Sequence, residues 1–136
     1  MKRIVIAILL GCMILAGCKE EPENMVDGPD MERDYHQISQ EEAMEMMKNE
    51  SDYVIVDVRT MEEYLEGHIP DAICIPVETI TNQQPSQLSD LNQTILVYCR
   101  SGNRSKQAAQ KLLELGYSKI YEFGGINTWP GEIVKD

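Results

Sequence analysis

The segment Cys99-Arg100-Ser101-Gly102-Asn103-Arg104-Ser105 holds the residues whose types and spacing best suit covalent chemistry. A cysteine is nucleophilic as a thiolate, and positive charge or backbone N–H groups aimed at its sulfur favour that form. Arg100 and Arg104 supply the charge, and a glycine-containing loop leading into a helix supplies the N–H groups. We therefore expect Cys99 to have a lowered pKa and to be a nucleophile rather than a structural cysteine.

The apolar pattern around this segment predicts alternating strands and helices. The expected strands cover 35–38, 53–58, 73–77, 94–98 and 119–123, and the expected helices follow a capping box at 39–42 or cover 61–66, 106–115 and 126–129. This alternation predicts an α/β fold, a single domain with a parallel sheet and helices on both faces. Ligands bind at the carboxyl ends of the strands in such sheets, and Cys99 follows the end of strand 94–98.

Composition limits the classes of partner and the sources of stability. The chain has 136 residues, of which 12 are basic and 23 acidic, for a net charge of −11. Nucleic-acid binding relies on clustered Lys and Arg, so we expect no nucleic-acid partner. The length suits one domain with a short extension. The four cysteines are too few and too scattered for a disulfide framework, so the core must supply the stability.

The N-terminus carries the features of a sorting signal. Lys2 and Arg3 precede an apolar run over 4–15, which is shorter than the about 20 residues of a transmembrane helix. The run ends in Leu15-Ala16-Gly17-Cys18, which resembles the signal of bacterial lipoproteins. In such signals the chain is cleaved before the cysteine, and the thiol takes a lipid. An uncleaved signal anchor is the alternative.

The lipoprotein signal predicts three parts and a location. We expect a cleaved signal over 1–17, an acidic, Pro- and Gly-containing tether over 18–33 and a folded domain over 34–136. Lipid on Cys18 would anchor the domain outside the cytoplasm, on a bacterial cell membrane.

Most of the chain after the tether resembles a rhodanese domain. The motifs that carry the resemblance are Asp57-Val58-Arg59, Glu62-Glu63-Tyr64, Gly67-His68-Ile69, Ala72, Ile75-Pro76, Val97 to Ser105, Gly116-Tyr117, Gly124-Gly125-Ile126 and Trp129. Their order and spacing are more specific than any one of them. The resemblance implies an α/β sandwich around a five-stranded parallel sheet, and a cysteine that accepts sulfane sulfur and passes it to a nucleophile, with no metal or organic cofactor.

The resemblance assigns the reaction to Cys99. Its thiolate would attack thiosulfate or a similar small anionic donor, hold the sulfur as a persulfide and release it to a thiol or to cyanide. The loop residues Arg100, Ser101, Gly102, Asn103, Arg104 and Ser105 would bind the substrate. The sequence does not distinguish which arginine meets the donor. The sequence also allows a protein as the acceptor of the sulfur.

Other residues that match the family have a structural role in our interpretation. We expect Asp57, Arg59 and His68 to form a polar network or to pack at a turn, rather than to take part in catalysis. Cys74 lies in an apolar strand, so we expect it to be buried and inert. The competing hypothesis is a resolving thiol that forms a disulfide with Cys99.

Two further functions were weighed against sulfur transfer. Cysteine phosphatases on the same fold carry an arginine six residues after the nucleophile, whereas Ser105 holds that position here, so phosphatase activity is disfavoured. The second alternative is a persulfide carrier, or a module that senses sulfur or redox species, with little turnover. The sequence does not separate a carrier from an enzyme.

Overall fold

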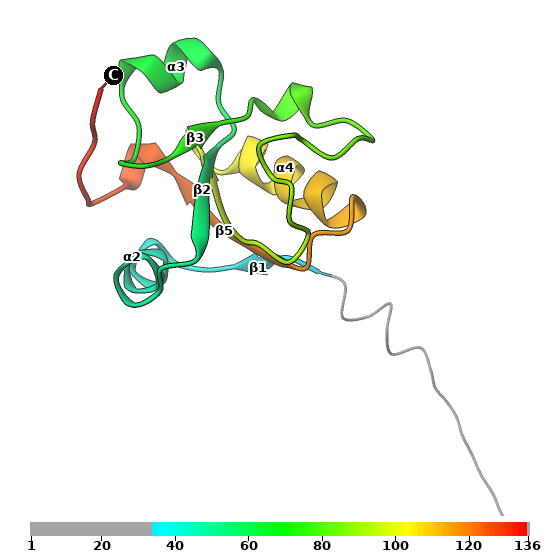
Figure 1. Ribbon diagram of the computed structural model, residues 1–136. Helices are drawn as coiled ribbons and strands as arrows, with labels where there is room; N and C mark the ends of the chain where they lie inside the picture. The colour runs from blue at the N-terminus through cyan, green and yellow to red at the C-terminus, as the bar shows by residue number, and fades with distance from the viewer. Residues whose placement is uncertain (1–33, 136) are drawn as a thin grey trace, which may run out of the picture. The chain divides into compact units, whose positions relative to one another are not determined.

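The computed structural model describes residues 34–135, and the predictions for residues 1–33, including lipidation of Cys18, lie outside this range. The strands are β1 (His36–Gln37), β2 (Tyr53–Asp57), β3 (Ile73–Cys74), β4 (Thr94–Cys99) and β5 (Lys119–Gly125). The helices are α2 (Gln40–Asn49), α3 (Met61–Glu66) and α4 (Asn103–Glu114), with 3-10 turns at Val77–Thr79 and Ile126–Thr128 (Figure 1). Within the described range, no helix has the length and apolar character needed to cross a membrane.

The strands form one parallel sheet, as the sequence predicts. Their order is β1-β5-β4-β2-β3, so β4 lies in the middle between β2 and β5. Cys99 is the last residue of β4 and pairs with Gly125 after a shift of register that follows Val97. The central strand therefore delivers Cys99 to the carboxyl edge of the sheet, where ligand sites of open α/β sheets lie.

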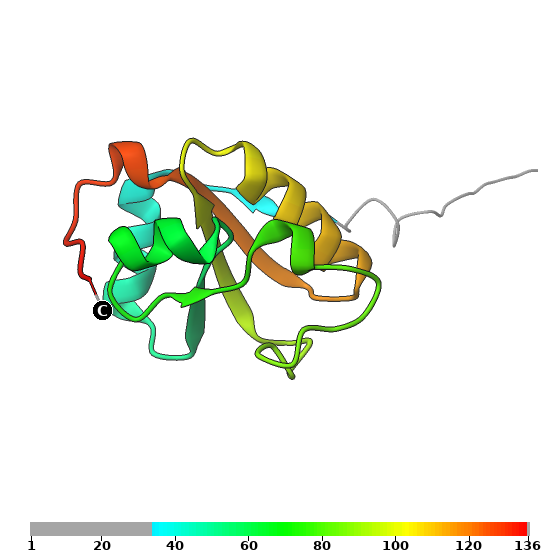
Figure 2. The ribbon, with the colours of Figure 1, turned by 90° about the horizontal axis from the view of Figure 1, so that it is seen from above.

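Helices cover both faces of the sheet (Figure 2), which confirms the predicted α/β class. On one face α4 packs on residues that include Val97, Cys99 and Ile120. On the other face α2, α3 and the turn after β5 pack on residues that include Leu96, Tyr98 and Phe123. Successive residues of β4 thus enter opposite cores, as expected for a strand buried on both sides.

Two capping boxes fix the starts of α2 and α3. Ser39 Oγ accepts the Glu42 N–H and Glu42 accepts the Ser39 N–H, which confirms the predicted box. Thr60 and Glu63 exchange the same pair of hydrogen bonds at the start of α3. Such boxes satisfy N–H groups that have no partner inside the helix.

Three boundaries differ from the prediction. Helix α4 begins at Asn103 rather than at residue 106, because Gly102 adopts a left-handed φ of 109° and turns the chain at once into the helix. Strand β3 ends at Cys74, and a 3-10 turn starts at Val77. Strand β5 continues to Gly125, because its end pairs with Cys99.

Candidate active site

The Cys99 sulfur lies where β4 meets the loop before α4. The residue is only 1% exposed, and the Gly102 N–H donates to Sγ at 3.0 Å. Gly102 is the N-terminal capping residue of α4, so the positive end of the helix macrodipole faces the sulfur. A strand end, a left-handed glycine and a helix start together aim backbone dipoles at one atom.

Ser105 adds a hydroxyl to this cluster. Its Oγ lies 3.5 Å from Cys99 Sγ and 3.0 Å from the Gly102 carbonyl oxygen, and the residue is fully buried in the first turn of α4. Because α4 starts at Asn103, Ser105 belongs to the helix and not to a loop, and the helix fixes its distance from the sulfur.

The surroundings of Cys99 lower the pKa of its thiol. Burial alone raises the pKa, and the hydrogen bonds of the Ser105 hydroxyl and of the N–H groups of Ser105, Gly102 and Ser101 outweigh it. The thiolate is therefore stabilised chiefly by neutral hydrogen-bond donors. The two neighbouring arginines, which we expected to contribute, have another partner.

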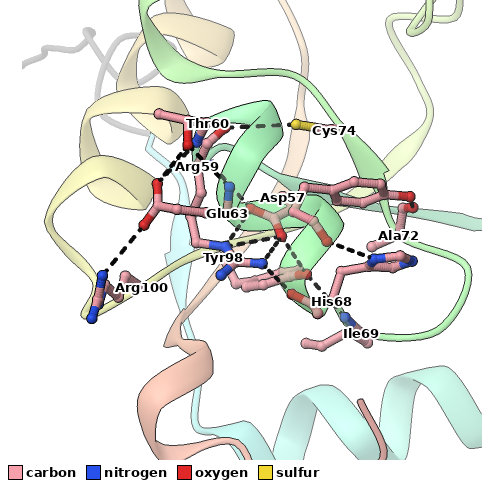
Figure 3. A network of polar contacts seen from close by, with 12 residues as sticks. Asp57, Arg59, Thr60, Glu63, His68, Ile69, Ala72, Cys74, Tyr98 and Arg100 are labelled. Atoms are coloured by element: carbon pink, nitrogen blue, oxygen red, sulfur yellow. Dashed lines mark hydrogen bonds and ion pairs between the residues drawn. The ribbon is translucent and has the colours of Figure 1, made fainter. Parts of the chain in front are cut away.

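Arg100 and Arg104 both approach Glu63 on α3. Arg104 forms a bidentate pair with the carboxylate, Nη1 to Oε1 at 2.8 Å and Nη2 to Oε2 at 3.1 Å. Arg100 Nη1 lies 3.7 Å from Glu63 Oε2, and its side chain is 64% exposed (Figure 3). The hydrogen bond from Arg104 is the largest cause that lowers the pKa of Glu63 to about 2. Arg104 is thus held in a close ion pair with Glu63, and the guanidinium of Arg100 is more accessible to a ligand.

Asp57, Arg59 and Tyr98 form a buried network beside the site (Figure 3). Arg59 Nη2 donates to Asp57 Oδ2 at 2.6 Å and to the Gly67 carbonyl oxygen at 2.7 Å. The Tyr98 hydroxyl donates to Asp57 Oδ2 at 2.7 Å and accepts the Ile69 N–H at 3.1 Å. These bonds join β2, β4 and the turn after α3, and none of them reaches the Cys99 sulfur.

His68 packs in that turn. Its ring is stacked on Tyr64 with centroids 3.8 Å apart, and Nδ1 lies 3.0 Å from the Tyr64 carbonyl oxygen. The backbone of His68 pairs with Val134 in the C-terminal segment. His68 is 2% exposed, so it contributes to the packing of the turn.

Comparison with known proteins assigns the family. The model of the rhodanese-like domain matches residues 39–132. The chain is 40% identical over 96 residues to the thiosulfate sulfurtransferase GlpE of Coxiella burnetii, covering 70% of this chain and 87% of the relative. It is 31% identical over 97 residues to a protein of Bacillus subtilis that is named "Putative sulfur carrier protein YrkF", covering 71% of this chain and 51% of the relative.

The chain belongs to the rhodanese-like family. A solved structure of similar fold is a rhodanese with anions from Escherichia coli, with a TM-score of 0.56 and 33% identity, covering 62% of this chain and 99% of that one.

The rhodanese-like domain holds a second cysteine at the carboxyl edge. Cys74 Sγ donates to the Arg59 carbonyl oxygen at 3.6 Å, and burial is the largest cause that raises the pKa of its thiol to about 11. Both cysteines are free. Strand β2 lies between them, and two strand spacings of about 4.8 Å exceed the roughly 7 Å that Cα atoms of a disulfide can span. The geometry does not favour a disulfide between them.

Two acidic residues of the site were missed by the sequence analysis. Glu63 appeared only as part of a motif, and its bond to Arg104 joins elements that are distant in sequence. Glu122 on β5 is 2% exposed and accepts the Ser105 hydroxyl. The available signal for Glu122 was its alternation with Ile120, which places a carboxylate on a buried face of the strand. Among residues 34–135, no group of three or more His, Cys, Asp or Glu side chains could hold a metal ion.

Proposed function

We propose that this protein is a sulfurtransferase that moves sulfane sulfur from thiosulfate, or a similar small anionic donor, to a thiophilic acceptor through a Cys99 persulfide. The observation that carries this proposal is the Cys99 sulfur, which accepts the Gly102 N–H at 3.0 Å and has a lowered pKa. The name of the relative GlpE supports thiosulfate as the donor.

In the first step the Cys99 thiolate attacks the outer sulfur of thiosulfate. A bond forms between Sγ and that sulfur as the sulfur–sulfur bond of the donor breaks, and sulfite leaves with the electron pair. The N–H groups of Ser101, Gly102 and Ser105 offer the persulfide anion the same donors that lower the pKa of the thiol.

In the second step the acceptor attacks the terminal sulfur of the persulfide. A thiolate acceptor becomes a persulfide, or cyanide becomes thiocyanate, and Cys99 is released as the thiolate that started the cycle. The two half-reactions share one sulfur and require a ping-pong order.

Arg100 is the residue we assign to the sulfonate end of the donor. Its side chain is 64% exposed and lies 3.7 Å from Glu63, whereas Arg104 holds the same carboxylate with two short hydrogen bonds. A hollow of about 290 Å³ beside the loop is lined by residues that include Arg59, Glu63 and Arg100. Arg100 can turn toward an anion without breaking a close pair.

A carrier with little turnover is the second candidate. The relative YrkF, whose name describes a sulfur carrier, favours it. So does the 1% exposure of Cys99, because a sheltered persulfide reacts slowly with small acceptors. Phosphatase activity is not favoured, since the sixth residue after the nucleophile is Ser105, whose hydroxyl faces the sulfur.

The test uses the reduced protein with thiosulfate and then cyanide. We expect intact mass to rise by one sulfur after the first reagent, and thiocyanate to appear after the second, with both lost in Cys99→Ser. A persulfide that forms but turns over slowly with every small thiol would favour the carrier. If folded, reduced protein takes up no sulfur from thiosulfate, polysulfide or a persulfide-bearing protein, the sulfurtransferase assignment is wrong.

We also propose that Cys18 is lipidated and holds the domain on the outer side of a bacterial membrane. The support is the sequence Leu15-Ala16-Gly17-Cys18 after an apolar run. Metabolic labelling with a fatty acid should label the wild-type chain in the membrane fraction and leave Cys18→Ser unlabelled. Label in Cys18→Ser, or none in the wild type, would contradict this proposal.

A further inference from the structure

Glu63 on α3 places a fixed negative charge at the mouth of the site, which we define by Glu63, Arg100 and Arg104. Its Oε1 accepts hydrogen bonds from the N–H and the hydroxyl of Thr60, both at 3.1 Å, so the carboxylate is held at the start of the helix (Figure 3). The hydrogen bond from Arg104 is the largest cause that lowers the pKa of Glu63 to about 2. Glu63 is therefore ionised throughout the neutral pH range.

This carboxylate is the shared partner of both arginines that follow Cys99. Arg104 binds it with two hydrogen bonds, at 2.8 and 3.1 Å, and Arg100 Nη1 lies 3.7 Å from Glu63 Oε2. A guanidinium has a limited set of N–H donors, and those directed at Glu63 are not available to a second anion. An anion that enters the mouth therefore competes with Glu63 for the same two groups.

The charges around the mouth nearly cancel. Arg59 lies in the lining of the hollow beside the loop, but it is paired with Asp57 at 2.6 Å. The other charged residues of that lining are Glu63, Glu66 and Arg100. The second arginine of the mouth brings the sum of these charges only to zero. A site that favours a doubly charged anion has an excess of positive charge, which the mouth lacks.

We propose that Glu63 is a specificity-determining residue that competes with the anionic end of the sulfur donor for Arg100 and Arg104. The energy of a charge pair is proportional to the charge of the ligand. Glu63 therefore weakens the binding of doubly charged donors, such as thiosulfate, more than that of donors with a single negative charge. This inference rests on the proposed function of Cys99 and deepens it by naming the class of donor that the site favours.

The first test compares two alkylating reagents of similar size on the full chain. Iodoacetate carries one negative charge, and iodoacetamide is its neutral counterpart. The ratio of their rates with Cys99 measures how the mouth receives an anion, because a change in thiolate population or in exposure of the sulfur alters both rates alike. Site-resolved mass spectrometry follows Cys99 apart from the other cysteines. In Glu63→Gln we expect this ratio to rise about 2- to 5-fold, the range that exposed charge pairs reach.

Glu62→Gln is the matched control, because it changes an exposed glutamate on the same helix. Within residues 34–135 no ion pair joins Glu62 to either arginine of the mouth, so the ratio should stay close to that of the parent. A structural disturbance in Glu63→Gln would slow or speed both reagents and leave the ratio unchanged. An unchanged or lowered ratio in folded Glu63→Gln would overturn the proposal.

The salt dependence of the parent serves if Glu63→Gln does not fold. Raising the salt from about 0.1 to about 1 M shortens the Debye length from about 10 to about 3 Å and weakens the attraction of uncompensated charges. In the parent, whose charges at the mouth cancel, the ratio of iodoacetate to iodoacetamide should not fall as salt is added. A steep fall would show free positive charge at the mouth and would contradict the proposed role of Glu63.

The second test measures sulfur transfer to cyanide. Glu63→Gln should lower KM for thiosulfate about 2- to 5-fold with a smaller change in kcat, a gain that loss of structure would not produce. The gain should be smaller for methanethiosulfonate, a donor with one negative charge. Equal gains, or a raised KM for thiosulfate, would overturn the inference and leave the sulfurtransferase proposal intact. A protein that transfers no sulfur but shows the raised alkylation ratio would refute only the proposed function.

Discussion

Cys74 and Cys99 stand at the same edge of the sheet, yet their thiols differ in chemistry. Burial raises the pKa of Cys74 to about 11, and its thiol donates a hydrogen bond to the Arg59 carbonyl oxygen. Cys99 is more deeply buried, but it accepts hydrogen bonds from the start of α4 and has a lowered pKa. Donors aimed at the sulfur, and not exposure, distinguish the two residues.

We expect Cys74→Ser to leave sulfur transfer unchanged. At neutral pH the Cys74 thiol is almost fully protonated, and the spacing of the strands keeps it away from Cys99. Steady-state thiocyanate formation and site-resolved alkylation would check this. A large loss of activity in a folded Cys74→Ser protein would show that Cys74 takes part in the cycle.

Arg100→Ala should raise KM for thiosulfate by about 5- to 10-fold, which corresponds to about 1–1.4 kcal/mol for an exposed charge that meets an anion. The expected effect on kcat is smaller, because the hydrogen bonds to Cys99 come from the loop backbone and Ser105. Initial rates at varied thiosulfate concentration measure both constants. Arg100→Lys, which keeps the charge, is the matched control, and an unchanged KM in Arg100→Ala would contradict the assignment.

At the scale of elements, α3 and α4 are joined by Glu63 and Arg104 across the mouth of the site. The carboxylate caps α3 through Thr60 and pairs with the guanidinium on α4. The capping box could have been found from the sequence, because its partners are three residues apart. The ion pair could not, because it depends on how two helices dock.

Glu63→Gln should remove a pH-dependent part of the stability. The pKa of Glu63 is lowered to about 2 in the folded protein from an ordinary value of 4.5. The contribution is therefore complete above about pH 4.5 and is lost as the pH falls toward 2. Urea unfolding followed by Trp129 fluorescence should show a wild-type advantage of roughly 1–2 kcal/mol at pH 7 that shrinks below pH 4.5. A difference that is constant with pH would contradict this.

Gly125→Ala should displace the loop that holds Cys99. A Cβ at this position would lie 2.0 Å from the Arg100 carbonyl oxygen and 2.6 Å from the Ser101 nitrogen, both backbone atoms. We expect a loss of roughly 1–3 kcal/mol of stability and slower alkylation of Cys99. Gly116→Ala controls for strain far from the sulfur: its Cβ would meet Leu91 at 3.7 Å without a clash, but its φ of 108° is unfavourable for alanine, so it should lose stability and keep the alkylation rate of Cys99. Unchanged alkylation in Gly125→Ala would show that the loop tolerates the shift.

At the scale of the whole molecule, the buried network of Asp57, Arg59 and Tyr98 joins β2, β4 and the turn after α3. Asp57→Asn leaves Arg59 buried without its carboxylate partner, so we expect a loss of about 3–5 kcal/mol. Thermal and urea unfolding would measure the loss. Where the variant is folded, the rate of Cys99 alkylation should stay close to wild type. A variant of normal stability with an unreactive Cys99 would instead place Asp57 in the catalytic machinery.

The sequence predicted the parallel α/β fold because each strand and helix carries its own pattern. It predicted the lowered pKa of Cys99 because the residues that signal it are contiguous in the loop. It placed the start of α4 at residue 106, three residues late, because the first residues of the helix, such as Asn103 and Arg104, are polar and do not show the helical spacing of apolar residues. It could not tell whether Arg100 or Arg104 is free to meet the donor, since this depends on how closely each pairs with Glu63 on α3. Contacts between distant segments were the part that sequence reasoning could not supply.

The pairing of Cys99 with Gly125 has a consequence for the growing chain. The loop rests on the end of β5, and the Arg100 carbonyl oxygen accepts the Asn127 N–H at 3.1 Å. A nascent chain that has reached α4 already contains its nucleophile but lacks the surface that shapes the loop. Cys99 should therefore reach its full reactivity only after β5 has emerged and docked, late in the synthesis of the domain. In an incompletely folded chain the Cys99 thiol would stay mostly protonated, and it would therefore be less readily oxidised until folding is nearly complete.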